Sequence, residues 1–118
     1  MNQWYEELPE KCPPSDAYNP NGKFYYRLVQ DLKNCEADLV SHRFLDPEKK
    51  FNADECICRA VSVFENIEDC ENLTKLPRHK NKHILKLKLN QNDGLIKQTG
   101  KPSHHSWWRS INFVLENE

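Results

Sequence analysis

Two adjacent tryptophans constrain this chain most strongly, because two neighbouring indole rings form a large apolar area that must be covered or bound. Trp107 and Trp108 follow two adjacent histidines, in a chain with only three tryptophans and five histidines. Neighbouring side chains of an extended strand point to opposite faces. We therefore expect one indole to pack inward and the other to be exposed, able to stack on a base, a sugar or another ring.

The length and composition predict a single small globular domain with a thin core. Of the 118 residues, 30% are charged and 37% are hydrophobic, and the mean hydropathy is −0.90. The 10% share of aromatic residues argues against a disordered chain. The 17 basic and 18 acidic residues almost cancel, which disfavours nucleic acid as a partner.

The sequence also predicts a cytoplasmic protein without a membrane partner. No apolar run approaches the roughly 18 residues of a membrane-spanning helix, and the first residues lack the pattern of a secretory signal. The number of cysteines is odd, and we expect all of them to be reduced thiols. They are Cys12, Cys35, Cys56, Cys58 and Cys70.

Residues 1–22 are expected to form an N-terminal arm rather than a packed element, because four prolines interrupt them. Trp4, Tyr5 and Leu8 could anchor this arm to the rest of the chain. Residues 23–118 are expected to form one compact domain.

Alternating apolar residues and turn signals predict a sheet within that domain. The expected strands are residues 23–29, 39–44, 56–64, 83–89, 95–99 and 107–115. The clearest of them alternates Leu85, Leu87 and Leu89 with lysines, so its leucines should face the core. For residues 56–64, a helical turn at the N-terminal end stays open as an alternative.

A helix is expected from Asn66, a residue type that caps helices, to about Lys75, because apolar residues recur there every three positions. Asp93 and Gly94 predict a hairpin between the strands on either side of them. Together these elements predict an α+β fold, with a small, mostly antiparallel sheet and one or two short helices.

Three candidate catalytic residues carry groups suited to acid–base or nucleophilic chemistry. His104 and His105 offer imidazoles that titrate close to neutral pH, and adjacent strand positions allow only one of them to face a pocket. Ser62 supplies a hydroxyl on another expected strand. Cys56 and Cys58 are too closely spaced for the usual structural zinc site, and no second cysteine pair follows, so we expect no metal.

A second group of residues is suited to holding an anionic ligand that contains a ring. Arg27 lies in an aromatic strand, where its guanidinium needs a partner, either an acidic side chain of the fold or a phosphate or carboxylate of a ligand. An aromatic ring would stack on the ligand, and a hydroxyl would bond to it. The predicted ligand-binding residues are Arg27, Tyr26, Ser41, Trp107, Trp108 and Arg109.

A family resemblance rests on the order of residues 24–29, 41–44, 59–64, the helix over 65–73 and residues 83–89. This order resembles that of small bacterial ADP-ribosyltransferase-like domains, which include the NAD-degrading toxins of toxin–antitoxin pairs. The resemblance implies an NAD-using transferase or glycohydrolase with NAD as its cofactor. It also implies that Arg27 contacts the pyrophosphate and that Tyr26 or a tryptophan stacks on nicotinamide.

The residues alone leave a non-catalytic binding module open as the alternative. In this module the Trp107–Trp108 region would hold a nucleotide-like small molecule or a protein partner. The absence of a paired acid and base in the sequence pattern favours the module, whereas the aromatic strand with its embedded Arg27 favours the enzyme.

Overall fold

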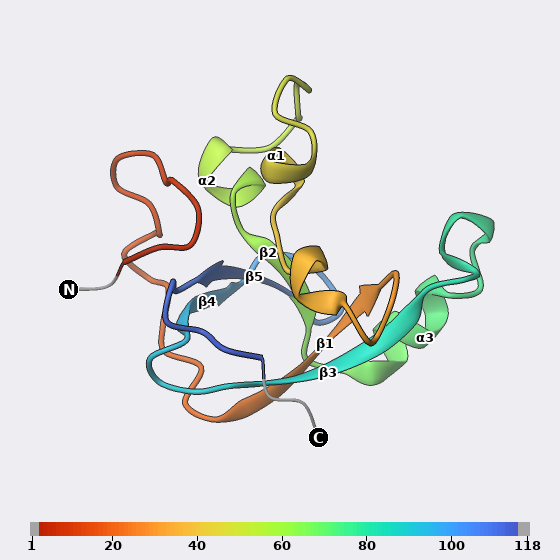
Figure 1. The fold of residues 1–118 in the computed structure, drawn as a ribbon. Coiled ribbons are helices and arrows are strands. Elements are labelled where there is room, and N and C mark those ends of the chain that lie inside the picture. Colours follow the sequence, from red (N-terminus) through yellow and green to blue (C-terminus); the bar gives the residue numbers. More distant parts are fainter. Residues whose placement is uncertain (1–2, 116–118) are drawn as a thin grey trace.

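Five strands form one antiparallel sheet in the computed structural model, which describes residues 3–115 (Figure 1). They are β1 (Lys23–Val29), β2 (Val61–Phe64), β3 (His83–Leu89), β4 (Gly94–Gln98) and β5 (His104–Arg109), in the order β3-β1-β2-β5-β4. The described helices are α1 (His42–Leu45), α2 (Glu55–Cys58), α3 (Ile67–Leu73) and the 3-10 turns η1 (Cys35–Asp38) and η2 (Pro77–His79). The predicted α+β class with a small antiparallel sheet is confirmed.

The alternation predicted for β3 sets the main core. Leu87 and Leu89 are buried, while Lys86 and Lys88 between and beside them are exposed. Tyr25, which pairs with Leu87 across the two strands, is also buried. These side chains belong to a single cluster with Leu39, Val61, Val63, Ile96, Trp107 and Phe113. The core therefore lies on one face of the sheet.

The predicted hairpin at Asp93 and Gly94 is wrong. The turn does connect β3 to β4, but these strands lie at opposite edges of the sheet and do not pair. Gly94 instead pairs with Arg109, and a Cβ atom at this position would lie 2.1 Å from the Trp108 carbonyl oxygen. The glycine is needed for this close approach of β4 to β5, so a glycine turn signal does not identify the partner strand.

Two of the predicted strands begin differently because hydroxyl and carboxylate side chains start helical turns there. The strand predicted over residues 39–44 is replaced by α1, since the Ser41 hydroxyl accepts a hydrogen bond from the Phe44 amide. The segment 56–64 takes the alternative left open, because Asp54 caps the short helix α2 before β2 begins. The last strand covers the two histidines and ends at Arg109, earlier than predicted.

The predicted helix after Asn66 is present as α3, but a different residue caps it. The Asn66 side chain makes no capping hydrogen bond, and its backbone amide donates to the Ser103 hydroxyl. The same hydroxyl also contacts the carboxylate of Asp69. Helix α3 contacts β1, β2 and β3. It lies in the connection from β2 to β3, which run parallel on either side of β1.

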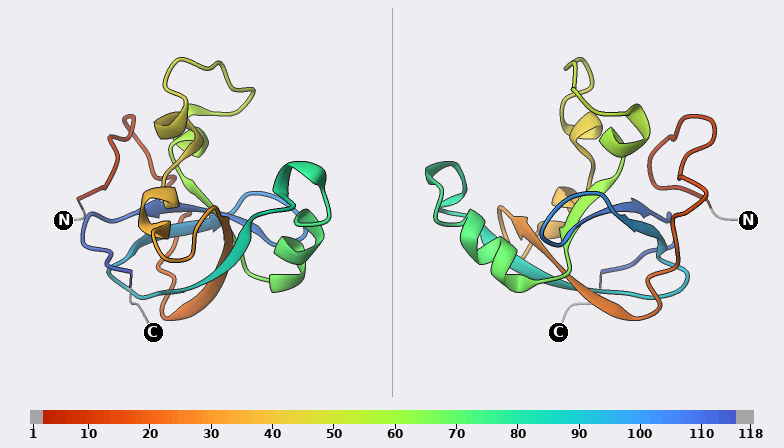
Figure 2. Two further views of the ribbon diagram at one scale, coloured as in Figure 1. Left: turned by 45° about the vertical axis from the view of Figure 1, so that its right-hand side comes forward. Right: turned by 180° about the vertical axis from the view of Figure 1, so that it is seen from behind.

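The N-terminal arm packs against the rest of the fold, and Trp4 and Leu8 are among the residues that anchor it. Trp4 forms a β-bridge with Ser110, and Tyr18 forms one with Ile96 on β4. A disulfide joins Cys12 to Cys56 in α2, so the prediction that all cysteines are reduced is wrong in this structure. Two further views show the arm beside β4 and β5 (Figure 2).

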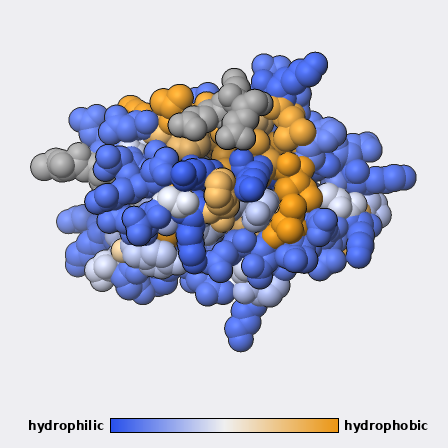
Figure 3. All heavy atoms as spheres, turned by 90° about the horizontal axis from the view of Figure 1, so that it is seen from below, coloured by the Kyte–Doolittle hydropathy of each residue, from blue (hydrophilic) through white to orange (hydrophobic). Residues whose placement is uncertain are grey.

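The surface is as polar as the composition predicts. Seen from below, hydrophilic residues cover most of the molecule, and hydrophobic atoms gather in one patch (Figure 3). Among the described residues, no helix has the length and apolar character needed to cross a membrane.

Replacing Leu87 by alanine should lower the free energy of unfolding by about 2–5 kcal/mol, because the leucine is 1% exposed in the main core. Chemical denaturation would measure the change. The matched control is Lys88→Ala on the exposed side of the same strand, which should change stability by no more than about 0.5 kcal/mol. Equal effects of the two substitutions would contradict the assignment of faces.

The disulfide predicts a specific thiol count. Denatured but unreduced protein should show three reactive thiols, those of Cys35, Cys58 and Cys70, and reduced protein should show all five. A count of five before reduction would mean that Cys12 and Cys56 are not joined in the purified protein.

Candidate functional site

Both indoles of the tryptophan pair are fully buried. Trp107 packs in the main core and donates a hydrogen bond from Nε1 to the Asp93 carbonyl at 3.0 Å. Trp108 lies on the opposite face of β5, where it packs with Ala60 and the disulfide residue Cys56. Its Nε1 donates to the Cys56 carbonyl at 2.9 Å. The expectation that one indole is exposed for stacking is therefore wrong.

The arm explains why the second indole is hidden. Trp4, Leu8, Cys12 and Ala17 of the arm all pack against the cluster that contains Trp108. A strand with a large ring on each face needs cover on both sides, and the arm with α2 supplies the second cover. A binding role for the Trp107–Trp108 region would require this cover to leave, so neither ring is available to a ligand or partner here.

Arg27 holds the fold together instead of facing solvent. Its guanidinium donates to the Asp38 carbonyl at 2.7 and 3.0 Å and to the Ser62 carbonyl at 2.8 Å. A longer contact of 3.4 Å reaches the Val40 carbonyl. The bond to Ser62 joins β1 to β2 beyond the single pair Tyr26↔Phe64, and the other bonds join β1 to η1 and the segment before α1. Because most of its donors are used internally, the predicted role of Arg27 as a phosphate clamp is wrong in this structure.

Ser41 and Arg109 are also structural. The Ser41 hydroxyl donates to the Glu6 carboxylate at 2.5 Å, which fixes the arm to α1. Arg109 is 5% exposed, donates to the Leu39 carbonyl at 2.8 Å and lies under the Tyr5 ring at 3.8 Å from its centroid. Neither side chain is free to bind a ligand.

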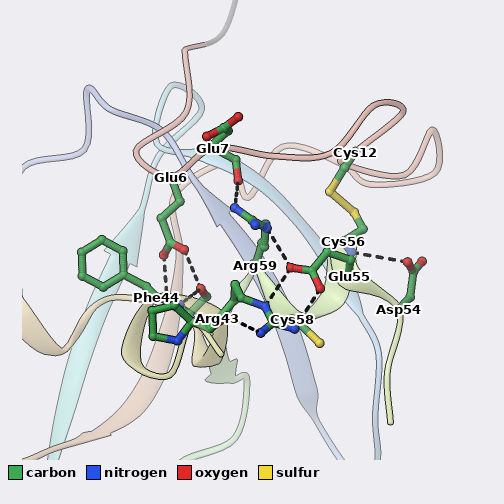
Figure 4. Close-up of polar contacts among 12 residues, drawn as sticks. Glu6, Glu7, Cys12, Arg43, Phe44, Asp54, Glu55, Cys56, Cys58 and Arg59 are labelled. Carbon is green, nitrogen blue, oxygen red and sulfur yellow. Dashed lines mark hydrogen bonds and ion pairs between the residues drawn. A yellow bond between two sulfur atoms is a disulfide. The ribbon is translucent and has the colours of Figure 1, made fainter. Parts of the chain in front are cut away.

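A carboxylate between two arginines completes the same region. Glu55 accepts hydrogen bonds from Arg43 at 2.9 and 3.0 Å and from Arg59 at 2.9 Å (Figure 4). Arg59 also donates to the Glu7 carbonyl of the arm at 2.7 Å. These contacts, with the disulfide, connect α1, α2 and the arm as one unit above β2.

The two histidines point to opposite faces of β5, as the alternation predicts. His105 is 3% exposed on the core side, where its Nδ1 lies 2.8 Å from the Ser103 carbonyl and its ring meets that of Tyr25. His104 is only half-buried on the other face. Of the two candidates, His104 is therefore the one that can meet a ligand.

His104 belongs to a row of side chains across three strands. The registers pair Tyr26 with Phe64 and Phe64 with His104, so the three lie side by side on one face. The Phe64 and His104 rings are 5.3 Å apart between centroids. We call Tyr26, Phe64 and His104 the histidine row, and strand spacing makes it about 10 Å long. Ser62 lies beside it, two positions from Phe64.

The polar atoms of this face are free. Among residues 3–115, no hydrogen bond is formed by the hydroxyls of Tyr26 and Ser62 or by Nε2 of His104. The buried polar atoms without a partner are found elsewhere, at Tyr25, His79 and Arg109. The free atoms of the row therefore reach the surface. The structure thus brings together three of the predicted site residues: Tyr26, Ser62 and His104.

Two lysines act electrostatically on His42, which in turn acts on His104. Burial lowers the pKa of His42, and the charges of Arg27, Lys49 and Lys82 lower it further. Lys82 is half-buried, and neither it nor Lys49 has an acidic ion-pair partner within the described residues. Unpaired basic groups around one point favour the binding of an anion.

His104 is affected by the same environment. Burial lowers the pKa of its imidazole, and the charges of His105 and His42 lower it further. The ring is therefore neutral at pH 7, and its Nδ1 lies 3.1 Å from the Thr99 hydroxyl.

The histidine row is an open sheet face rather than a closed cavity. One hollow of about 330 Å³ lies over η1, between Lys33 and Ala37, and is also lined by Leu115. Another of about 160 Å³ lies between the arm and α2, beside Arg59. Neither hollow is lined by a predicted catalytic or ligand-binding residue. Within residues 3–115, no three His, Cys, Asp or Glu side chains are grouped so that they could hold a metal ion.

Comparisons with known proteins give no further guide to this face. No protein-family model, no curated protein and no solved structure matches the chain.

Sequence reasoning missed several residues of this face. Thr99 and Phe64 were not singled out, because their importance depends on which strands pair. His42 was not predicted as a ligand-binding residue, since it was placed on a strand that does not form. For Thr99, the only sequence signal was the turn predicted by the residues that follow it. This turn brings the end of β4 back to His104.

The pKa of His104 should lie below the ordinary histidine value of about 6.5. The unfolded chain then binds the proton more tightly, so stability is full above about pH 6.5 and falls as the pH drops toward the folded-state pKa. NMR titration of the ring measures the pKa directly. Between pH 7 and pH 5, the His104→Gln variant should lose less stability than the wild type. The control is His83→Gln, which removes an exposed histidine from the edge strand β3. A pKa at or above 6.5 would contradict the described burial.

Proposed function

We propose that the protein binds a phosphorylated, ring-bearing small molecule of the NAD type on the sheet face that carries the histidine row. The observation that carries the proposal is the convergence of Tyr26, Ser62 and His104, whose polar atoms are free and reach the surface. Such a face combines an aromatic plane with hydrogen-bonding groups, which is what a nucleotide requires.

The phosphate end of the ligand is assigned to the basic groups beside the row. The charges of Lys49 and Lys82 both act on His42, and no acidic side chain among residues 3–115 forms an ion pair with either lysine. An anion placed there would be attracted by the two lysines, whose charges no acidic partner neutralises. His104 at the end of the row can add a hydrogen bond to the same anion.

The ring of the ligand is assigned to Tyr26. This side chain is half-buried on β1, and its free hydroxyl leaves one end of the ring in contact with water. The resemblance to ADP-ribosyltransferase-like domains supports the choice of NAD, with Tyr26 in the stacking role that it implies. The phosphate contacts differ from those it implies, because His42 and Lys82 replace Arg27.

A cytoplasmic location stays a prediction. The Cys12–Cys56 disulfide favours an oxidising compartment instead, because cytosolic thiols are normally kept reduced. Counting thiols on protein trapped directly from cells, without prior reduction, would decide between the two.

Calorimetric titration with NAD, ADP-ribose and ADP tests the proposed ligand class. His104→Ala should weaken binding about ten- to hundredfold, since a hydrogen bond to a charged group contributes about 1.5–3 kcal/mol. Ser62→Ala should weaken it less, by the smaller contribution of a neutral hydroxyl. Release of nicotinamide in the same mixtures would show whether the bound molecule is also cleaved.

His83→Ala is the matched control for this experiment, because His83 is an exposed histidine on the edge strand β3. This variant should bind as the wild type does. The proposal fails if none of the three compounds binds at millimolar concentration, or if the two histidine variants lose the same affinity.

A further inference from the structure

Two hydroxyl groups form a short chain that ends at His104. The Thr99 Oγ1 atom lies 2.7 Å from Ser106 Oγ and 3.1 Å from His104 Nδ1. Ser106 is 2% exposed, and its hydroxyl has no other partner among residues 3–115. The hydroxyl chain therefore runs from a buried serine, through a threonine, to one nitrogen of the candidate ligand-binding imidazole.

The direction of the hydrogen bonds follows from this burial. A buried hydroxyl proton needs an acceptor, and the proton of Ser106 can reach only Thr99 Oγ1. Thr99 then uses its own proton for its other neighbour, Nδ1 of His104. An Nδ1 that accepts carries no proton, so in the neutral ring the proton is on Nε2. The opposite direction would leave the Ser106 proton buried without an acceptor.

The backbone around Thr99 keeps the ring in this position. The amides of Thr99 and Gly100 both donate to the His104 carbonyl, at 3.0 and 3.2 Å. A Cβ atom at Gly100 would lie 3.1 Å from His104 Cβ and 3.3 Å from Nδ1. The turn after β4 thus packs directly on the imidazole, and a side chain at Gly100 would make this contact tighter.

We propose that Thr99 is a positioning residue, and that the hydroxyl chain fixes His104 in the tautomer whose Nε2–H donates a hydrogen bond to the ligand. The inference rests on the proposed function, and it narrows the ligand class. The group that meets His104 is a hydrogen-bond acceptor, such as a phosphate or carbonyl oxygen, and not an ammonium or amide N–H. A neutral ring held in this way recognises an anion without first taking up a proton.

The tautomer can be measured on the protein without any ligand. In protein labelled with ¹⁵N in its histidine rings, long-range proton–nitrogen spectra at about pH 8 distinguish a protonated ring nitrogen from an unprotonated one. The wild type should show His104 with an unprotonated Nδ1 and a protonated Nε2. Thr99→Val, which keeps the shape but removes the hydroxyl, should shift both nitrogens toward the average of a mixed population. Thr99→Ser should restore the wild-type pattern.

Binding of ADP provides the second readout. Thr99→Val should weaken ADP binding about two- to tenfold, as expected for one misaligned hydrogen bond, and Thr99→Ser should recover it. A wild-type His104 with its proton on Nδ1 would overturn the inference, as would a Thr99→Val spectrum identical to that of the wild type. If the spectra agree with the inference but no variant binds ADP, ADP-ribose or NAD, the proposed function fails and the hydroxyl chain stands.

Discussion

The fold depends on covering two adjacent indoles that point to opposite faces of one strand. Rings of this size each bury roughly 150–250 Å² of surface, and each indole N–H needs an internal acceptor once it leaves water. The main core covers Trp107, and the Asp93 carbonyl accepts its hydrogen bond. On the other face the arm and α2 cover Trp108, and the disulfide between Cys12 and Cys56 closes this cover. The arm is for this reason part of the domain and not an appendage.

Two arginines stabilise the fold by binding backbone carbonyls. Arg27 connects β1 with β2 and with the segment before α1, where the direct pairing of the two strands is limited to one residue pair. Arg109 does the same between β5 and Leu39. A guanidinium can donate in several directions at once, so it satisfies carbonyls that irregular segments would otherwise leave buried without a donor. The sequence pattern predicted that both guanidinium groups bind a ligand, but in the structure they bind backbone carbonyls instead.

The candidate site forms on the part of the sheet that remains uncovered. The arm covers Trp108 at one end of β5, while His104 at the other end stays half-buried beside Tyr26 and Phe64. The histidine row therefore combines residues from three separate strands, held in place by strand register rather than by a local motif.

The sequence by itself determined the α+β class, the strand β1, the strand β3 with its inward and outward faces, the helix α3, and the opposite orientations of His104 and His105. Each of these depends on local periodicity, which the chain carries in full. Only the tertiary structure decided that β3 and β4 do not pair, that the arm buries Trp108, and that Arg27 binds carbonyls. It also decided that Thr99 meets His104. These features depend on contacts between residues far apart in the sequence. A local pattern of apolar or charged residues does not reveal whether those side chains contact solvent, a ligand or another segment of the chain.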